Sequence, residues 1–583
     1  MKKLKILNLM VVAILFMGNG LLAQSNERGY YDAPYTRYEA NLGTLSKATI
    51  TSKSFAQKDL QSEASEQVCV DMTASKASVE WKLKNAADGM VVRYSIPDST
   101  SGELDVYANG KLVGTLKLSS QWSWEYLWSN GNPNNSGVIN TNPRMRFDEA
   151  RMKLPAKIPA GGKLKLVTKS GKIHIDFVEM EAIPPRVEPA AGDVVYKKDE
   201  STEGDGTDLQ NFIDRNPGKT IYVPEGVYKM GWELYFGNDN SALKGAGSWY
   251  TELHFTSMKW LKGGLYANAK DISFSGLYLT TENNSRSSSY KAINGIFTSK
   301  SVIKDFWAEH FECGAWIAQY NAGEVAFADG FLVTNCRFRN NYADGINLCK
   351  GTRNTIVEHC SFRNNGDDDM AIWCADNMEC QNNTFRYCTS ENSWRASGCA
   401  IYGGLNNKAH HLLIKDNLEA GLRANNAFPG IAFNNAGMHE FSDITIVRCG
   451  TNNDLYYGPI GAIDLMCTDR NGFSVKNIKF SNIDIIDSKN DAIYFNIWGG
   501  RDFTNMVFEN INIDGTGREY PVNNGKEEDT ERGFGILFKR NPKGTATYCN
   551  ITIKNRGGNA KQDISLEQIG KLEWKEAPGC VKK

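Results

Sequence analysis

Three aspartates in the middle of the chain have a spacing that could support chemistry on a sugar polymer. The segment CRFRNN at 336–341 returns as CSFRNN at 360–365, so the repeat has an offset of 24 residues. Asp344 follows the first copy, and Asp367 and Asp368 follow the second. If each copy forms one turn of a stacked fold, these carboxylates lie on neighbouring turns about 4.8 Å apart. Two or three carboxylates on one surface are what hydrolysis of a glycosidic bond requires.

The expected closeness of these aspartates predicts that they differ in proton affinity. Adjacent like charges raise the pKa of at least one carboxyl group, which then donates a proton near neutral pH while its neighbours stay anionic. A single Asp-Asp pair is more often a solvated turn or part of a calcium site. A repeat that brings three carboxylates together favours catalysis.

Short strand-like segments recur from about residue 270 to the C-terminus, as in 271–279, 477–485 and 506–513. They are rich in Ile, Val and Phe and are separated by Asn, Asp and Gly, which is typical of a solenoid whose turns bury their apolar side chains against one another. Asparagine tolerates left-handed backbone geometry. Bends of the coil are therefore predicted at five asparagines next to strands: Asn335, Asn382, Asn477, Asn482 and Asn510.

The N-terminal part has a different pattern. Longer alternating segments with an Asn109-Gly110 hairpin signal predict an antiparallel β-sandwich over 67–183. Residues 24–66 show no period and are expected to form a poorly ordered leader. A Pro-rich linker at 184–198 then leads into a β-helix over 199–583, which begins with a short helical stretch.

Residues 1–23 have a basic head, an apolar middle and a small residue, Ala23, before a polar stretch. This pattern predicts a secretory signal peptide and a secreted or periplasmic protein. A membrane anchor is the alternative, although Gly18, Asn19 and Gly20 interrupt a run that is already short for a membrane span. No other segment is apolar enough to cross a bilayer.

The composition excludes several partners. With 66 basic and 67 acidic residues the net charge is −1, which argues against nucleic acid, an anionic membrane or a polyanionic substrate and favours a neutral ligand.

Thirteen cysteines would allow disulfides after export. Cys336 and Cys360 occupy equivalent repeat positions and are expected to form a buried ladder. Zinc is not expected, because the close pair Cys374 and Cys380 has no histidine at ligand spacing.

The segment QWSWEYLW contains four aromatic residues within seven positions, Trp122, Trp124, Tyr126 and Trp128. Period-two spacing would place all four on one face of a strand. They could form a platform for pyranose rings, or they could pack in a core or a domain interface. The sequence leaves both interpretations open.

Two resemblances concern the fold. The run GELDVYANGKLVGTLKL, followed later by HIDFVEME, resembles jelly-roll carbohydrate-binding modules of the family 6 and 35 type. The segment GDGTDLQ, followed by IYVPEGVY, resembles the entry to right-handed parallel β-helices of the pectate-lyase superfamily. Together they imply an all-β protein in which a jelly-roll sandwich precedes a parallel β-helix.

A third resemblance concerns the chemistry. The segments NNYADGIN, GTRNTIVEHCSFRN and GDDDMAIW closely resemble glycoside hydrolase family 87, the α-1,3-glucanases and mycodextranases. The resemblance implies an inverting hydrolase acting on α-1,3-glucan or on nigeran, whose α-1,3 and α-1,4 links alternate. It makes Asp367 the general acid, and Asp344 and Asp368 the groups that activate water at about 6.5–9.5 Å from the acid. Asp369 is then peripheral.

Binding of a neutral glucan needs aromatic walls and polar partners. Trp373 and Trp394 are the main candidates for substrate contact, and packing is the alternative role for each. Further candidates are Trp307, His310 and Tyr402. No cofactor or catalytic metal is expected, a structural calcium ion is left open, and the protein is expected to be a monomer.

Three other functions are weighed. A polygalacturonase would share the Gly-Asp-Asp pattern, but the Gly-His-Gly and Arg-x-Lys groups that serve a uronate have no match after Asp368. A polysaccharide lyase would need a basic residue, for which Arg395 or His310 is available. A non-catalytic β-helix adhesin would need no carboxylate cluster, and fold alone does not decide function.

Overall fold

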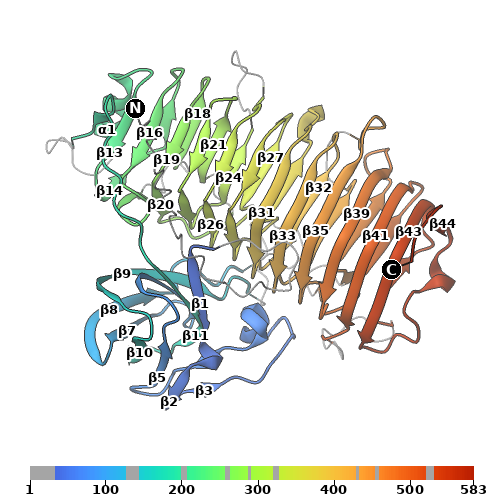
Figure 1. The fold of residues 1–583 in the computed structure, drawn as a ribbon, viewed down its shortest axis with the longest axis horizontal. Coiled ribbons are helices and arrows are strands. Elements are labelled where there is room, and N and C mark those ends of the chain that lie inside the picture. The colour runs from blue at the N-terminus through green and yellow to red at the C-terminus, as the bar shows by residue number, and fades with distance from the viewer. Residues whose placement is uncertain are drawn as a thin grey trace, which may run out of the picture.

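The computed structural model describes residues 33–126, 143–197, 207–256, 263–286, 290–318, 327–427, 432–453, 458–519 and 531–582. Within these ranges the chain is almost entirely β-structure, with one α-helix, α1 (Thr207–Asp214). An antiparallel sandwich lies against the N-terminal half of a long stack of parallel strands, and the C-terminal turns extend beyond it (Figure 1). The predicted sandwich followed by a parallel β-helix is confirmed. None of the described residues form a helix with the length and apolar character of a membrane span.

The sandwich consists of two antiparallel sheets that enclose a core of fully buried side chains such as Val79, Val92 and Leu166. One sheet contains β3 (Thr49–Ile50), β4 (Val70–Asp71), β11 (His174–Glu181), β6 (Ala87–Ser95) and β9 (Asp148–Ile158), with β1 (Tyr35–Glu39) paired to β11. The other contains β2 (Thr44–Ser46), β5 (Ser78–Lys82), β10 (Lys163–Ser170), β7 (Ser101–Ala108) and β8 (Lys111–Ser119). Because β1 to β3 belong to these sheets, the prediction of a poorly ordered leader is wrong from residue 35 onward.

The β-helix is built from two long parallel sheets and a short hairpin. The first sheet has 11 strands: β15 (Leu234–Phe236), β18 (Leu265–Asn268), β21 (Lys291–Ile296), β24 (Cys313–Ile317), β27 (Ile346–Cys349), β30 (Met370–Trp373), β32 (Ser397–Tyr402), β34 (Ala420–Asn425), β38 (Ile463–Thr468), β40 (Ile493–Trp498) and β42 (Ile536–Lys539). The hairpin contains β36 (Thr451–Asn453) and β37 (Gly458–Ile460).

The second sheet has 20 strands and carries two strands per turn over much of its length. They are β12 (Val194–Val195), β13 (Thr220–Val223), β14 (Gly226–Met230), β16 (Ala242–Gly245), β17 (Thr251–Phe255), β19 (Ser273–Ser275), β20 (Tyr278–Thr281), β22 (Val302–Lys304), β23 (Trp307–Glu309), β25 (Leu332–Thr334), β26 (Arg337–Arg339), β28 (Ile356–Glu358), β29 (Ser361–Arg363), β31 (Thr384–Glu391), β33 (Lys408–Lys415), β35 (His439–Val447), β39 (Val475–Ile486), β41 (Phe503–Thr516), β43 (Lys543–Arg556) and β44 (Lys571–Glu576). Since β12 already pairs with β13, the β-helix begins five residues before the predicted boundary at 199.

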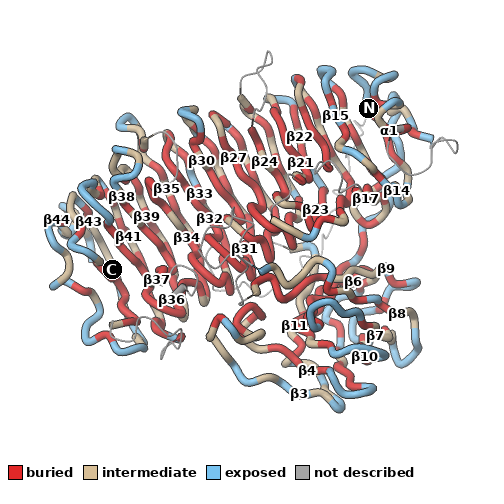
Figure 2. The backbone as a smooth tube through the Cα atoms, turned by 180° about the vertical axis from the view of Figure 1, so that it is seen from behind, coloured by how far each residue is buried: buried red, intermediate tan, exposed pale blue. Residues whose placement is uncertain are grey.

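Side chains inside the coil stack on their equivalents in the next turn, and the buried interior runs the length of the β-helix (Figure 2). Phe338 and Phe362 stack with ring centroids 5.6 Å apart. Cys336 and Cys360 are buried free thiols, as the ladder prediction requires. The five asparagines predicted at bends all have positive φ, between 54° and 57°.

A buried ion network joins the sandwich to the turns that carry the repeat. Arg339 and Arg363, one from each copy, reach the carboxylates of Glu149 and Glu179 on the sandwich. The Arg363 contacts measure 2.6 and 2.7 Å, and all four side chains are at most 1% exposed. Buried charges of this kind are tolerated only when they are paired. The sandwich is therefore fixed to two adjacent turns of the β-helix.

The tryptophan-rich segment contributes to this domain contact. The Trp122 ring stacks on His310 of the β-helix at 4.3 Å, and its Nε1 donates to the carbonyl oxygen of Thr281. Trp124 has a φ of 66°, so the described part of the segment is not a regular strand, and the period-two spacing does not apply to it. Trp128 lies outside the described residues. The packing interpretation is correct for Trp122.

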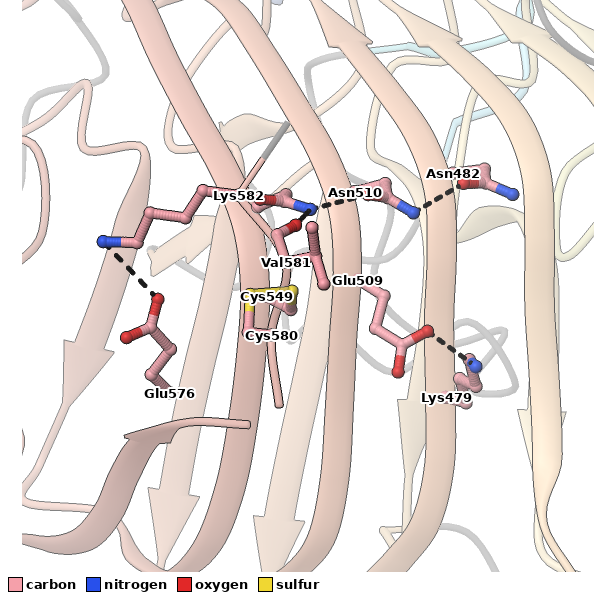
Figure 3. Close-up of a disulfide and its surroundings, with 10 residues drawn as sticks. Lys479, Asn482, Glu509, Asn510, Cys549, Glu576, Cys580, Val581 and Lys582 are labelled. Carbon is pink, nitrogen blue, oxygen red and sulfur yellow. Dashed lines mark hydrogen bonds and ion pairs between the residues drawn. A yellow bond between two sulfur atoms is a disulfide. The ribbon is translucent and has the colours of Figure 1, made fainter. Parts of the chain in front are cut away.

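The C-terminal end of the core is covered by β44. Trp574 of β44 stacks on Tyr548 of β43 at 4.9 Å and contacts three phenylalanines below it. A disulfide between Cys549 and Cys580 then ties the segment after β44 back to β43, next to a ladder of asparagines (Figure 3). The disulfide closes a loop with a sequence separation of 31 residues.

Replacing both Cys549 and Cys580 by serine is expected to lower stability by up to about 4 kcal/mol, because the cross-link restricts the unfolded chain. The melting temperature of the double variant should fall to that of the reduced wild-type protein. Adding a reductant to the double variant should change nothing. A wild-type melting temperature that does not respond to the reductant would contradict the disulfide.

Candidate active site

The structure brings the three predicted aspartates together. Asp344 lies in the turn between β26 and β27, and Asp367 and Asp368 lie in the equivalent turn between β29 and β30. The amide of Gly345 donates to the carbonyl oxygen of Asp368 at 3.1 Å, which fixes the two turns side by side. One carboxylate oxygen of each aspartate lies within 4.8 Å of the others. Asp344 and Asp368 are buried, whereas the Asp367 side chain is 25% exposed.

The turn that carries Asp367 needs a glycine at 366. A Cβ atom there would lie 2.0 Å from the indole of Trp394 and 2.3 Å from the carbonyl oxygen of Tyr342. Trp394 is fully buried beneath this glycine and packs with Tyr342 and with Met145 of the sandwich. The prediction that Trp394 contacts the substrate is therefore wrong, because its ring supports the turn and presents no face to solvent.

Two arginines surround Asp367. Arg286 pairs with its carboxylate and also donates to the carbonyl oxygens of Tyr342 and Gly366, both at 2.9 Å. Arg395 lies 3.6 Å from the same carboxylate oxygen. Burial raises the pKa of Asp367, but the two guanidinium charges outweigh burial, so the pKa lies below its usual value.

Asp368 is held by hydroxyl groups from the next strand. Ser397 and Tyr402 of β32 both donate to its carboxylate, Tyr402 at 2.8 Å. Burial and the charge of Asp367 raise the pKa of Asp368 to about 6, although Arg423 and the two hydroxyls oppose this rise. Tyr402, predicted as a substrate contact, lies in the site as a hydrogen-bond donor to Asp368.

Asp344 is the second aspartate of the group with a raised pKa. Burial, together with the charges of Asp367 and Asp368, raises its pKa well above the usual value. The sequence predicted that the short distances between the aspartates would raise the pKa of at least one of them. The directions of the pKa shifts agree with this prediction. These shifts favour a proton on Asp344 or Asp368 over one on Asp367, the residue to which the resemblance assigns the acid role.

Asp369, which follows directly, points away from this group. Its carboxylate is fully buried and accepts hydrogen bonds from Asn365, at 2.7 Å, and from Ser390. Burial raises its pKa to about 7. Asp369 therefore belongs to the interior of the coil.

The remaining predicted substrate contacts fall in two places. Trp373 at the end of β30 is half-buried beside the aspartates and packs edge-to-face against Trp316 at 5.8 Å. Trp307 is fully buried under the sandwich, where its Nε1 donates to Glu309 at 2.8 Å. His310 is 3% exposed and its Nε2 lies 3.0 Å from Asp148 of the sandwich. The predictions for Trp307 and His310 are wrong because both side chains belong to the domain interface.

In the described part of the chain, the three aspartates are the one group of acidic, histidine or cysteine side chains close enough together to hold a metal ion. Arg286 and Arg395 already supply positive charge beside Asp367. The arrangement therefore fits an acid–base group. The calcium ion left open by the sequence stays untested.

Sequence reasoning missed Arg286, Ser397 and Asn347, which touch the aspartates. Arg286 lies 81 residues before Asp367, in a polar segment without any signal of its own. Ser397 opens the strand that pairs with β30, and Asn347 follows Asp344 by three residues. Extending the repeat alignment by one further turn could have indicated Ser397.

Comparisons with known proteins agree with this geometry. The family described as "Alpha-1,3-glucanase catalytic domain D1" matches residues 32–183, and "Alpha-1,3-glucanase catalytic domain D2" matches residues 196–561. No curated protein sequence matches the chain.

Solved structures match over nearly the whole chain. The Agl-KA catalytic domain is 33% identical with a TM-score of 0.86, and the match covers 94% of this chain and 98% of that one. The catalytic unit of the thermostable GH87 α-1,3-glucanase from Streptomyces thermodiastaticus is 24% identical with a TM-score of 0.78. The match covers 94% of this chain and 96% of that one. A GH87 α-1,3-glucanase catalytic domain in complex with nigerose is 22% identical with a TM-score of 0.79. The match covers 94% of this chain and 99% of that one. With both domains matched, the chain belongs to the α-1,3-glucanase catalytic-domain family.

Proposed function

We propose that the protein hydrolyses α-1,3-glucosidic bonds in a neutral α-glucan, with Asp344, Asp367 and Asp368 as the catalytic residues. The observation that carries the proposal is the meeting of three carboxylates on adjacent turns of a chain in this family. Three related GH87 structures each have one aspartate replaced by alanine and contain nigerose or tetrasaccharides. Those aspartates are separated by 23 and 24 residues, which are the separations of Asp344 from Asp367 and Asp368.

The carboxylate spacing suits activation of one water molecule. A water that donates to two oxygens at about 2.8 Å each, with about 105–120° between the two hydrogen bonds, bridges oxygens about 4.4–4.9 Å apart. The oxygens of the aspartates lie within 4.8 Å of one another, so two of them can hold one water jointly. This water is the nucleophile that hydrolysis requires.

Asp367 is the member that a glycosidic oxygen can reach, since the other two are buried. This exposure supports the acid role that the family resemblance gives it. Its proton must come from Asp344 or Asp368, whose pKa values are raised and whose oxygens are within 4.8 Å. We therefore propose that one proton is shared within the group and delivered through Asp367.

The family match argues against the other functions that were weighed. An adhesin would not need three buried or half-buried carboxylates at one point. Neither the polygalacturonase nor the lyase alternative is supported, because both matched domains are α-1,3-glucanase catalytic domains.

Incubation with α-1,3-glucan, nigeran, dextran and polygalacturonate, followed by measurement of reducing ends, tests the substrate. Release is expected from α-1,3-glucan or nigeran. The pattern of products from these two polymers separates a glucanase from a mycodextranase. No release from either, or release from polygalacturonate alone, would refute the proposal.

Asp367→Asn should lower kcat about 10²- to 10⁴-fold, because general acid catalysis contributes an effect of this size. The melting temperature should stay close to that of the wild type. Asp376→Asn is the matched control, since Asp376 is an exposed aspartate paired with Lys350. An Asp367→Asn variant as active as this control would remove Asp367 from the mechanism.

Tyr402→Phe tests the shared proton through pH dependence. The Tyr402 hydroxyl stabilises ionised Asp368, so its removal raises the Asp368 pKa above about 6. A higher pKa keeps the proton bound to higher pH, and the alkaline limb of kcat/KM should therefore move upward. Tyr235→Phe, which alters an exposed tyrosine of the same sheet, should leave the limb in place. A limb that stays or moves downward in Tyr402→Phe would contradict the assignment.

The stereochemical outcome needs its own experiment. The family resemblance implies inversion, but the 4.8 Å oxygen spacing is below the roughly 6.5–9.5 Å expected between acid and base in inverting enzymes. We propose inversion, supported by the site for a shared water. Anomer-resolved NMR should show the β-anomer as the first product, and an initial α-anomer would exclude direct attack by water.

We also propose that the protein is exported and acts as a monomer. The N-terminal pattern at 1–23, which lies outside the described residues, and the Cys549–Cys580 disulfide support export, because disulfides persist in oxidising compartments. A mature N-terminus at Gln24 and a monomer mass in light scattering are the expected results.

A further inference from the structure

A segment of three residues before and at the start of β32 contacts two of the aspartates. Arg395 lies 3.6 Å from the Asp367 carboxylate, and the Ser397 hydroxyl donates to the Asp368 carboxylate. Ala396 lies between these two residues and has a φ of 61°. Both contacts therefore depend on the backbone conformation of Ala396.

Alanine does not favour this left-handed conformation. A positive φ brings its Cβ atom too close to the following carbonyl oxygen. Asparagine, which occupies many bends of this coil, has a short polar side chain that can bond to the local backbone and offset the cost. Alanine has no such group, so the surroundings must hold Ala396 in place.

Glu419 holds Ala396 from the next turn of the β-helix. Its carboxylate accepts a hydrogen bond from the Ala396 amide at 2.9 Å, and the Ala420 amide donates to the Ala396 carbonyl oxygen at 3.0 Å. Glu419 is 1% exposed, and burial of a carboxylate is costly unless it is paired. Arg423 lies 3.8 Å from the same carboxylate oxygen and also donates to Asp464 at 3.0 Å.

The turn that carries Glu419 is itself held on both sides. On one side, the Leu418 amide donates to the carbonyl oxygen of Ser393 at 2.8 Å. On the other, the buried ammonium group of Lys489 donates to the carbonyl oxygens of Asn417 and Leu418, at 2.7 and 3.4 Å. The Glu419 carboxylate therefore extends from a fixed backbone.

We propose that Glu419 is a positioning residue for the hydrolysis of α-1,3-glucan, because its carboxylate fixes the Ala396 amide and thereby holds Arg395 and Ser397 against the catalytic aspartates. This inference rests on the proposed function. Glu419 acts through the backbone of Ala396, so a change in the length of its side chain alters both contacts at once.

Two substitutions separate the length of the Glu419 side chain from its charge. Glu419→Asp keeps the charge near Arg423 but withdraws the carboxylate by one methylene group from the Ala396 amide. On α-1,3-glucan its kcat should fall about 10- to 100-fold, as expected when catalytic contacts are slightly misplaced. Glu419→Gln keeps an oxygen at full length, and its kcat should fall at most about 5-fold, the difference between a charged and a neutral hydrogen bond.

The pH profile separates positioning from a loss of stability. In Glu419→Asp, Asp367 loses the nearby charge of Arg395 and Asp368 loses the hydroxyl of Ser397, both of which lower the pKa of the aspartate they contact. The aspartates then keep their proton to higher pH, so the alkaline limb of kcat/KM should move upward. In Glu419→Gln the limb should stay or move downward, because a negative charge is lost. The charged or titratable side chains around Glu419 and these aspartates are Arg286, Arg395, Tyr402, Arg423, Asp464 and Lys489.

Glu440→Asp is the matched control, since Glu440 of β35 is a partly exposed glutamate that pairs with Lys408 at 3.6 Å. It should change neither kcat nor the alkaline limb. Melting temperatures show whether each variant is folded at the assay temperature.

Equal kcat values in Glu419→Asp and Glu419→Gln, or an alkaline limb in Glu419→Asp that does not rise, would overturn the positioning role. A larger loss in Glu419→Gln than in Glu419→Asp would also overturn it, because neutralisation of Arg423 would then be the role of Glu419. If Glu419→Asp does not fold, a loss of more than about 10-fold in folded Glu419→Gln is the overturning result. A wild-type enzyme that releases nothing from α-1,3-glucan or nigeran would instead refute the proposed function.

Discussion

The stacking of one turn of the β-helix on the next, at an offset of 24 residues, is the constraint on which the site depends. Parallel pairing sets Phe338 over Phe362 and Ile346 over Met370, so every position between them is fixed as well. Asn341 donates to Asn365 at 2.9 Å inside the same turns. The carboxylates follow this register: Asp344 cannot leave Asp368 without breaking the ladder on either side. The hydrogen bonds between adjacent strands thus hold three carboxylates close together although these carboxylates repel one another.

The sandwich also holds the two turns that carry the repeat in position. Arg339 and Arg363 are repeat equivalents, and both are neutralised by Glu149 and Glu179 from the sandwich. Removing one partner of such a buried group costs about 3–5 kcal/mol, because the other charge is left buried alone. Met145 adds an apolar contact to Trp394, directly beneath the turn of Asp367. The sandwich is thus a structural part of the catalytic unit, which explains why Trp122 packs in the domain interface instead of forming a platform for pyranose rings.

The sequence allowed the solenoid, the positive-φ asparagines and the three aspartates to be predicted, because each depends on local pattern and repeat spacing. It did not allow the roles of Trp394, Trp307 and His310 to be predicted. Nearness in sequence does not say whether a side chain faces solvent or a second domain, and these three lie under turns or under the sandwich. Arg286 was beyond reach for a different reason, since its contact with Asp367 is created by a turn 81 residues away.

The repeat places the aspartates in equivalent positions, whereas the arginines make the surroundings of one aspartate different from those of the others. Stacking alone makes Asp344 and Asp368 equivalent neighbours, and equivalent acids would have no reason to divide the roles of acid and base. Arg286 and Arg395 both pair with Asp367. These two charges lower the pKa of Asp367 below its usual value, while burial raises those of Asp344 and Asp368. Proton affinity therefore decreases from the buried aspartates toward the exposed one, and the arginines create the asymmetry that hydrolysis needs.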